Sequence, residues 1–355
     1  MKIVTVIGAR PQFIKAATVS RVVSERSDVS EVIVHTGQHF DQNMSDVFFD
    51  EMEIPKPNYH FSINGFSHGA MTGQMLEKIE KILLKEKPDW VLVYGDTNST
   101  IAGALAASKL HIKVAHVEAG LRSFNMRMPE EQNRILTDRI STALFCPTEQ
   151  AVKNLNNEGY ENLDIDIKNV GDVMYDAAMF YSEKSEAKAS FKKIEGDFVL
   201  VTCHRAENTD DPSRLRAIVN SLNEINKAVK VILPLHPRTK KMMEKEGLSF
   251  AFETTDPVGY FDMVELLKNC KFVITDSGGL QKEAYFFNKP CITMRDETEW
   301  IELVDHGVNT LVGAKQEKIL AAFSEISNKT IDFPKGLYGD AKAAEKIVNY
   351  LIENN

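Results

Sequence analysis

The sequence predicts an α/β protein made of two doubly wound, Rossmann-like domains. Short apolar runs alternate with helix-like segments along the chain, as is typical of a parallel sheet covered by helices on both faces. A length of 355 residues suits two domains better than one. The runs that we expect to be strands span residues 3–8, 31–37, 90–96, 113–120 and 143–148 in the first half, and 198–204, 229–237, 272–279 and 289–294 in the second.

The strand–helix pattern pauses around residues 169–173, and a charged stretch follows at 182–197. We therefore predict an N-terminal domain over residues 1–171 and a C-terminal domain over residues 172–355, facing each other across a cleft. Residues 338–351 form an amphipathic pattern that predicts a terminal helix, which could pack on either domain and which we include in the second.

The composition excludes several classes of function. A net charge of −9 argues against a protein that binds nucleic-acid phosphates. The sequence has no run of about 18 apolar residues and starts directly on a strand pattern, which argues against membrane insertion and predicts a cytoplasmic protein. Cys146, Cys203, Cys270 and Cys291 are scattered without ligand-like spacing, so we expect buried thiols and no metal site.

Residues 113–139 carry the densest group of charged side chains. Glu118 directly follows an apolar strand, and Pro129 with Glu130 and Glu131 marks a helix start. In an α/β sheet, ligands bind at the strand ends that lead into helices. This stretch is therefore either a ligand site or a capped surface helix with solvated charges.

Two other turns of the first half carry candidates. Asp96 lies at the C-terminal end of the run at 90–96, where it could move a proton or simply belong to a helix cap. Arg10 precedes a proline at a strand-to-helix turn, and a guanidinium suits phosphate, although a surface arginine is as plausible there. The turn lacks the glycines of dinucleotide-binding and phosphate-binding loops, which argues against a nicotinamide cofactor.

In the second half, His204 and Arg205 follow one strand and His236 follows the next. Imidazole and guanidinium groups at successive strand ends predict a site for anion binding and proton transfer. The alternative is an ordinary surface loop.

The turn Ser277-Gly278-Gly279 lies between a strand and a helix. Its backbone N–H groups at a helix N-terminus would bind an anion, and a diphosphate would fit. Glu283, about one turn into that helix, could accept hydrogen bonds from ribose hydroxyls. A plain glycine-rich turn is the alternative.

The ordered blocks GARPQFIK, TGQH, YGDTNST, HVEAGLRS, PEEQNR, CHRAEN, DSGGLQKEA and KPCITMRDETEW together resemble the non-hydrolysing UDP-N-acetylglucosamine 2-epimerase family. The resemblance covers nearly the whole chain and implies the GT-B fold, a UDP-sugar as ligand, no cofactor, and a homodimer. Members of that family eliminate UDP with loss of the C2 proton, pass through 2-acetamidoglucal, and add UDP back with C2 inverted.

The resemblance also implies roles for individual residues. The family's catalytic groups correspond to Asp96, Glu118, Glu130 and His204. Its phosphate and uridine contacts correspond to Arg10, Ser277, Gly278, Gly279 and Glu283, and we add Lys15, Arg205 and His236 as binding residues. Glu131 looks more like a structural carboxylate.

The substrate stays open between two sugars. The resemblance first implies interconversion of UDP-N-acetylglucosamine and UDP-N-acetylmannosamine for surface polysaccharide synthesis. Departures from the family pattern at His236-Pro237-Arg238 and Glu297–Trp300 resemble the branch that acts on UDP-2,3-diacetamido-2,3-dideoxyglucuronic acid. Arg238 or Arg127 could pair with the extra carboxylate of that sugar. A hydrolysing epimerase and a non-catalytic nucleotide-sugar binder are further alternatives.

Overall fold

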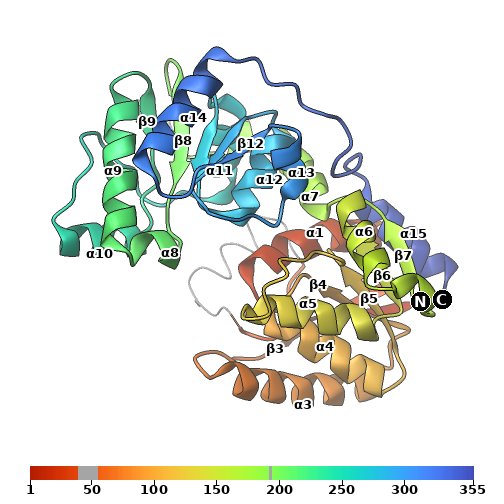
Figure 1. Ribbon diagram of the computed structural model, residues 1–355. Coiled ribbons are helices and arrows are strands. Elements are labelled where there is room, and N and C mark those ends of the chain that lie inside the picture. The colour runs from red at the N-terminus through yellow and green to blue at the C-terminus, as the bar shows by residue number, and fades with distance from the viewer. Residues whose placement is uncertain (39–54, 192–193) are drawn as a thin grey trace. The chain divides into compact units, whose positions relative to one another are not determined.

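The chain folds into two compact units, as the computed structural model in Figure 1 shows for residues 1–38, 55–191 and 194–355. Unit 1 comprises Met1–Ala177 and Gly336–Asn355, and unit 2 comprises Ala178–Lys335. Each unit contains one sheet whose paired strands are all parallel. The predicted α/β class with two doubly wound domains is thereby confirmed.

The sheet of unit 1 has seven strands in the order β3-β2-β1-β4-β5-β6-β7. The central strands are almost wholly apolar and buried on both faces, which is why they read as continuous hydrophobic runs. The strands are β1 (Lys2–Ile7), β2 (Ser30–His35), β3 (Tyr59–His60), β4 (Trp90–Tyr94), β5 (Lys113–Val117), β6 (Ala143–Cys146) and β7 (Asp166–Asn169).

Helices cover both faces of this sheet. Figure 1 shows α3, α4 and α5 side by side on one face, while α1 packs against α15, the C-terminal helix. The opposite placement of α1 follows from right-handed crossovers, because the chain moves one way from β1 to β2 and the other way from β4 to β5. The helices are α1 (Arg10–Ser24), α3 (His68–Glu86), α4 (Asn98–Lys109), α5 (Pro129–Ile140), α6 (Glu149–Asn157), a 3₁₀ turn (Tyr160–Asn162) and α15 (Ala343–Glu353).

Unit 2 repeats the scheme with a five-stranded sheet in the order β12-β11-β10-β8-β9. The strands are β8 (Phe198–Thr202), β9 (Lys230–Ile232), β10 (Val273–Thr275), β11 (Cys291–Thr293) and β12 (Asn309–Leu311). The helices are α8 (Ala206–Thr209), α9 (Pro212–Asn226), α10 (Pro237–Glu246), α11 (Tyr260–Asn269), α12 (Gly278–Phe286), α13 (Ile301–Asp305) and α14 (Gln316–Asn328). Helices α9 and α14 pack together, and their apolar side chains join one hydrophobic core with the sheet.

Each sheet has a switch point, where successive connections leave in opposite directions. In unit 1 it lies between β1 and β4, and in unit 2 between β8 and β10. Ligands of doubly wound proteins bind at the carboxyl ends of the strands beside such a point.

The terminal helix belongs to unit 1 and not to the second domain, in which its position along the chain would place it. Helix α7 (Val173–Lys188) runs across the boundary between the units, so residues 172–177 also belong to unit 1. The Asp176 carboxylate accepts hydrogen bonds from the N–H groups of Ala343 and Ala344, at distances of 3.1 and 2.8 Å, in the first turn of α15. An amphipathic pattern alone does not tell which apolar surface a helix covers, and here that surface is supplied by α1 and its neighbours.

Asp176 gives a pH-dependent contribution to stability. Burial raises its pKa from 3.8 to about 6, against the opposing effect of the two N–H donors. The folded state then binds the proton more tightly than the unfolded chain, so stability falls as pH rises from about 4 to about 6, by roughly 3 kcal/mol at most. We expect Asp176→Asn to remove this decline in thermal unfolding, whereas Asp164→Asn, at an exposed site, should keep the wild-type profile.

Candidate functional site

In unit 1, the turns after β1 and β4 meet at the switch point and are joined by Gln12. Its side-chain oxygen accepts hydrogen bonds from the N–H groups of Gly8 and Ala9, and its amide nitrogen donates to the carbonyl of Tyr94 and the hydroxyls of Thr97 and Thr100. Five hydrogen bonds to one buried amide therefore hold the two turns in register. Thr97 also caps α4 by accepting from the N–H of Thr100.

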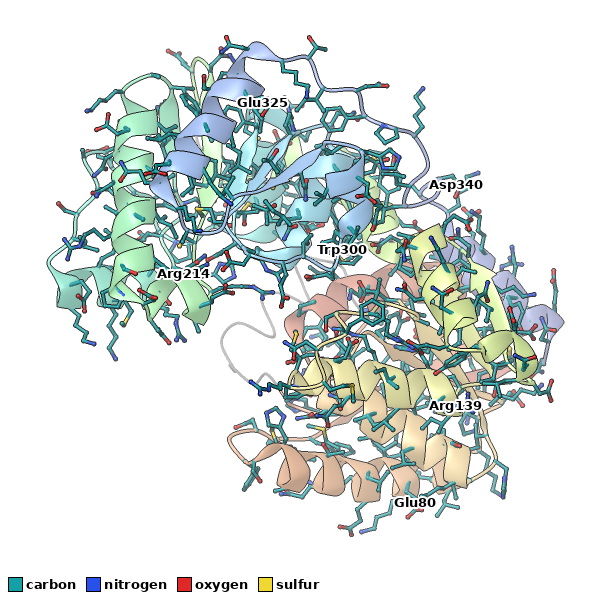
Figure 2. The ribbon with its side chains drawn as sticks, in the orientation of Figure 1. Glu80, Arg139, Arg214, Trp300, Glu325 and Asp340 are labelled. Carbon is teal, nitrogen blue, oxygen red and sulfur yellow. The ribbon has the colours of Figure 1, made fainter. Side chains whose placement is uncertain are left out.

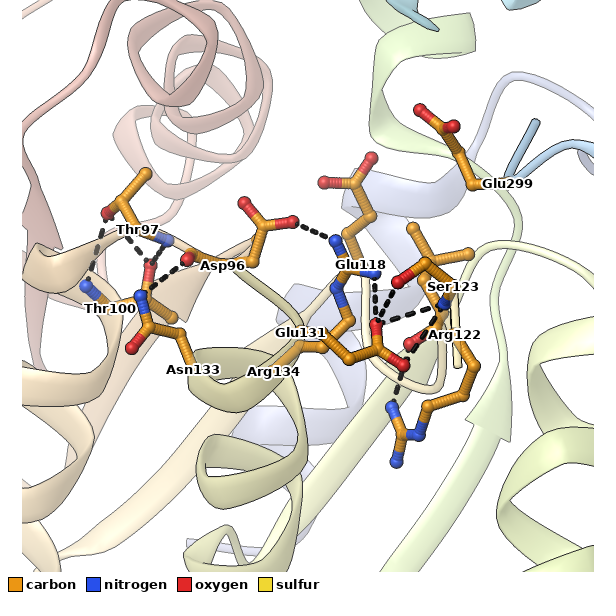
Figure 3. Close-up of polar contacts among 12 residues, drawn as sticks. Asp96, Thr97, Thr100, Glu118, Arg122, Ser123, Glu131, Asn133, Arg134 and Glu299 are labelled. Carbon is orange, nitrogen blue, oxygen red and sulfur yellow. Dashed lines mark hydrogen bonds and ion pairs between the residues drawn. The ribbon is translucent and has the colours of Figure 1, made fainter. Parts of the chain in front are cut away.

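Asp96 lies on the second of these turns and is paired with Arg134 of α5. Arg134 Nη2 lies 2.7 Å from Asp96 Oδ2. Figure 3 marks this ion pair with a dashed line. Burial raises the pKa of Asp96, the guanidinium opposes this, and the nearby Glu118 carboxylate adds to it. A carboxyl group whose pKa is moved upward beside a charged partner is a candidate for proton transfer.

Glu118 follows β5 and forms an ion pair with Lys15 of α1. Both side chains are largely buried, with exposed fractions of 9% for Glu118 and 11% for Lys15. The backbone of Glu118 has φ = 68°, in the left-handed region that residues with a Cβ seldom adopt, and its N–H shares the carbonyl of Phe145 with that of Ala119. Such strained positions cluster at functional sites.

The two acids that open α5 have different surroundings. Glu131 is buried and accepts hydrogen bonds from the N–H groups of Ser123 and Phe124 as well as from Arg134 Nη1, at 2.6 Å. Glu130 is exposed at the helix start. Glu131 is therefore the structural carboxylate of the pair, which leaves Glu130 as the acid that can meet a ligand.

A cavity of about 230 Å³ opens at this switch point. Its lining includes Lys15, Asp96, Asn98, Glu130 and Asn133. Asn133 donates to the carbonyl of Asp96 over 2.9 Å, which fixes the turn from the α5 side. Glu118 is close by, since a Cβ placed on Gly95 would lie 3.2 Å from its Oε2. The sequence candidates Lys15, Asp96, Glu118 and Glu130 thus gather at one place.

In unit 2, the buried Asp276 joins the turns that follow β8 and β10. Its carboxylate accepts hydrogen bonds from the N–H groups of His204 and Arg205, both over 3.0 Å, and from the amide of Asn208. These bonds fix the loop that carries His204 and Arg205 next to the start of α12.

The two candidate histidines of unit 2 lie beside each other. The ring centroids of His204 and His236 are 5.4 Å apart, and His236 Nδ1 accepts from the N–H of Arg238 at the start of α10. Partial burial lowers the pKa of His236, and the neighbouring His204 and Arg238 lower it further. Arg238 itself is paired with Asp210.

Helix α12 begins at the predicted anion site. Ser277 caps it by accepting from the N–H of Leu280, and the early N–H groups of a helix have no partner within it. No heavy atom of the described residues beyond the local backbone lies within 4 Å of a Cβ placed on Gly279. A Cβ on Gly278 would lie 2.5 Å from Glu299 Oε1 and 3.7 Å from Arg205 Nη2.

The structure thus distributes the predicted residues over two switch points. Unit 1 holds Lys15, Asp96, Glu118 and Glu130, and unit 2 holds His204, Arg205, His236, Ser277, Gly278, Gly279 and Glu283. Arg10 begins α1, but its side chain lies outside the described part of the chain. The four cysteines are buried and unpaired, as predicted.

Sequence reasoning missed three residues that hold these sites together. Gln12, Arg134 and Asp276 make the contacts that join the turns. Gln12 and Arg134 lie within the motif blocks GARPQFIK and PEEQNR, and Asp276 directly precedes the Ser-Gly-Gly turn. A polar residue between a buried strand and a glycine-rich turn was the available signal for Asp276.

Two kinds of feature are absent from the described residues. No helix in them is long and apolar enough to cross a membrane. They also contain no group of three His, Cys, Asp or Glu side chains placed to hold a metal ion.

Comparison with known proteins gives concordant matches. Residues 21–352 match the family model described as UDP-N-acetylglucosamine 2-epimerase. The chain is 57% identical to UDP-2,3-diacetamido-2,3-dideoxy-D-glucuronate 2-epimerase of Pseudomonas aeruginosa, with 99% of this chain and 100% of the relative covered. It is 45% identical to UDP-N-acetylglucosamine 2-epimerase of Methanocaldococcus jannaschii, with 99% of each chain covered.

Solved structures agree. The crystal structure of the M. jannaschii UDP-GlcNAc 2-epimerase in complex with UDP-GlcNAc and UDP matches with a TM-score of 0.87 and 42% identity, covering 99% of this chain and 100% of that one. The Neisseria meningitidis enzyme bound to UDP-GlcNAc matches with a TM-score of 0.88 and 31% identity, with both chains fully covered. The fold is therefore of the GT-B type, and the chain is a UDP-sugar C2 epimerase that belongs to the UDP-N-acetylglucosamine 2-epimerase family.

Proposed function

We propose that this epimerase inverts C2 of UDP-2,3-diacetamido-2,3-dideoxy-D-glucuronate. The observation that carries the chemistry is the pair of carboxylates at the switch point of unit 1. Burial raises the pKa of Asp96, and Glu118 is paired with Lys15 beside the same cavity. Two positioned carboxylates are suited to acid–base chemistry on one substrate.

In the proposed reaction a carboxylate of unit 1 takes the proton from C2 of the sugar while the bond between C1 and the diphosphate oxygen breaks. UDP leaves with the bonding electrons, and a C1–C2 double bond remains in the sugar. UDP then adds back to C1 as a proton is returned to C2 from the opposite face. Asp96, Glu118 and Glu130 are the candidate proton carriers.

Unit 2 supplies the proposed binding site for UDP. Negative charge develops on the diphosphate as the bond to C1 breaks, and the N-terminus of α12 with Ser277, Gly278 and Gly279 offers N–H donors and a favourable helix dipole. Arg205 and His204 are fixed beside it by Asp276. Glu283 on α12 and His236 are proposed contacts to the nucleotide and substrate, and Arg10 and Lys15 of unit 1 are proposed phosphate contacts.

The choice of sugar rests on similarity. The relative with 57% identity acts on the diacetamido-uronate according to its name, whereas the M. jannaschii relative with 45% identity is named as a UDP-N-acetylglucosamine 2-epimerase. UDP-N-acetylglucosamine is therefore the second candidate. Arg238 is already paired with Asp210, so we do not assign it as the partner of the sugar carboxylate.

The test is incubation in deuterated water with each nucleotide sugar separately. We expect deuterium at C2 of the epimer from the diacetamido-uronate and much slower exchange from UDP-N-acetylglucosamine. The reverse preference would support the second substrate, and stoichiometric release of free UDP would indicate a hydrolysing enzyme. Absence of exchange with both nucleotides would contradict the proposed function.

We further propose a homodimer in the cytoplasm. Leu84 at the end of α3 and Leu136 on α5 are each more than half exposed, and these helices flank α4 on one face of unit 1, which would suit a second copy of the chain. The buried, unpaired cysteines fit a reducing compartment. Light scattering should give twice the chain mass, and the double change Leu84→Glu with Leu136→Glu should give the mass of one chain.

A further inference from the structure

His116 lies on β5, buried beneath the turns that carry Asp96 and Glu118. Its Nε2 is 2.7 Å from the carbonyl oxygen of Gly95, and its Nδ1 is 2.7 Å from Asp138 Oδ1. Neither the His116 nor the Asp138 side chain is exposed. Because a carbonyl oxygen only accepts hydrogen bonds, Nε2 must carry a proton.

Nδ1 must carry a proton as well. Asp138 Oδ2 accepts from Arg122 Nη1 over 2.7 Å and from the N–H of Gly120 over 3.2 Å, and a guanidinium at that distance favours the ionised carboxylate. An ionised carboxylate cannot donate to Nδ1. A ring with a single proton would leave two buried acceptors facing each other at 2.7 Å, which is unfavourable.

The charges around His116 balance when the ring is cationic. Arg122 is shared between Asp138 and Glu158, with Nε 2.7 Å from Glu158 Oε1. Two cations, His116 and Arg122, then face two anions, Asp138 and Glu158. The other titratable groups near Asp138, Cys146 and Tyr160, have pKa values raised mainly by burial and also by Asp138, so both stay neutral.

This cluster holds both catalytic turns. Gly95, which precedes Asp96, accepts from His116 through its carbonyl and donates its N–H to the carbonyl of Val117 over 3.0 Å. Asp138 in turn accepts a hydrogen bond from the N–H of Gly120. Gly120 lies two residues after Glu118, and the backbone of Glu118 is in the left-handed region. One buried ion pair therefore fixes the positions of Asp96 and Glu118 relative to each other.

We propose that His116 is a doubly protonated imidazolium that acts as a positioning residue for the carboxylates of Asp96 and Glu118. The protonation state inferred for His116 goes beyond the proposed function and does not depend on that function. The expected effect of His116 on turnover does rest on the proposed function.

The protonation state is measured on the full chain labelled with ¹⁵N in its histidine rings. We expect one of the 9 histidines to show both ring nitrogens protonated, unchanged between pH 6 and 9. The signal is assigned by backbone-linked NMR in the wild type, so the result does not depend on a variant folding. A His116 ring with one protonated nitrogen, or one that titrates in this range, would overturn the proposal.

The positioning role is tested with His116→Gln, which keeps one donor, and His116→Leu, which keeps none. We expect kcat to fall on the order of 10²-fold in the leucine variant and less in the glutamine variant, because small displacements of reacting groups are costly. UDP affinity should stay within twofold. Loss of the buried positive charge should also move the acid limb of the kcat profile to higher pH.

His306→Gln is the matched control, since His306 is exposed on unit 2. A variant that folds with wild-type kcat and an unmoved acid limb would refute the positioning role. If neither variant folds, the ring signals of the wild type still decide the protonation state on which the role depends. Wild-type protein without isotope exchange on either nucleotide would instead contradict the proposed function and leave the NMR result standing.

Discussion

Replacing Glu118 with glutamine is expected to lower kcat by about 10³-fold or more while leaving UDP affinity nearly unchanged. A glutamine keeps the shape of the side chain but cannot take or return a proton, and acid–base groups typically contribute about 10²–10⁴-fold. The change also leaves Lys15 without its ionic partner in a largely buried site. UDP affinity should change little because most of the proposed diphosphate contacts, namely the Ser277-Gly278-Gly279 turn with His204 and Arg205, belong to unit 2.

Steady-state rates, UDP titration calorimetry and C2 exchange in deuterated water check this expectation. Glu80→Gln, on the outer face of α3, serves as the control for loss of a carboxylate from unit 1 and should behave like the wild type (Figure 2). A non-catalytic nucleotide-sugar binder would have no turnover to lose. An E118Q protein that exchanges the C2 proton at the wild-type rate would exclude Glu118 as a proton carrier.

The sequence was sufficient for the fold class because the signal for a buried parallel sheet is local. Residues 90–94 read as a continuous apolar run, and all five side chains are buried in β4. The unit to which the terminal helix belongs could not be predicted from local sequence patterns, since its apolar face could have covered either sheet. The contact that assigns it to unit 1 joins Asp176 to residues 167 and 168 positions further along the chain.

Only part of the candidate site, too, could be predicted from local sequence patterns. Strand ends and a helix start marked Asp96, Glu118, Glu130 and Glu131 as candidates, and the resemblance to the epimerase family then singled out Asp96, Glu118 and Glu130. The roles of Arg134 and His116 depend on partners from other elements, which strand periodicity does not reveal. A buried histidine in an apolar strand reads as part of the core until the two groups at its ring nitrogens are known.

Replacing Gly279 with alanine is expected to separate stability from ligand binding. The glycine is exposed in the first turn of α12, has no positive φ, and a Cβ there would meet no heavy atom of the described residues beyond the local backbone. Alanine should therefore stabilise the protein by about 0.4–1 kcal/mol, because it restricts the unfolded chain. If a diphosphate lies against this turn, the methyl group occupies the space that a phosphate oxygen needs, and the Kd for UDP should rise about tenfold or more.

Gly73→Ala on α3 is the matched control, because this glycine is also exposed and helical with open space around a Cβ. It should give a similar gain in thermal stability with no change in UDP affinity. The contrast is informative because most substitutions that weaken ligand binding also destabilise the fold. Gly279→Ala should instead weaken UDP binding while it stabilises the fold. An alanine at position 279 that stabilises the chain yet binds UDP as tightly as the wild type would place the diphosphate away from the start of α12. The Ser277-Gly278-Gly279 turn would then be a glycine-rich connection alone.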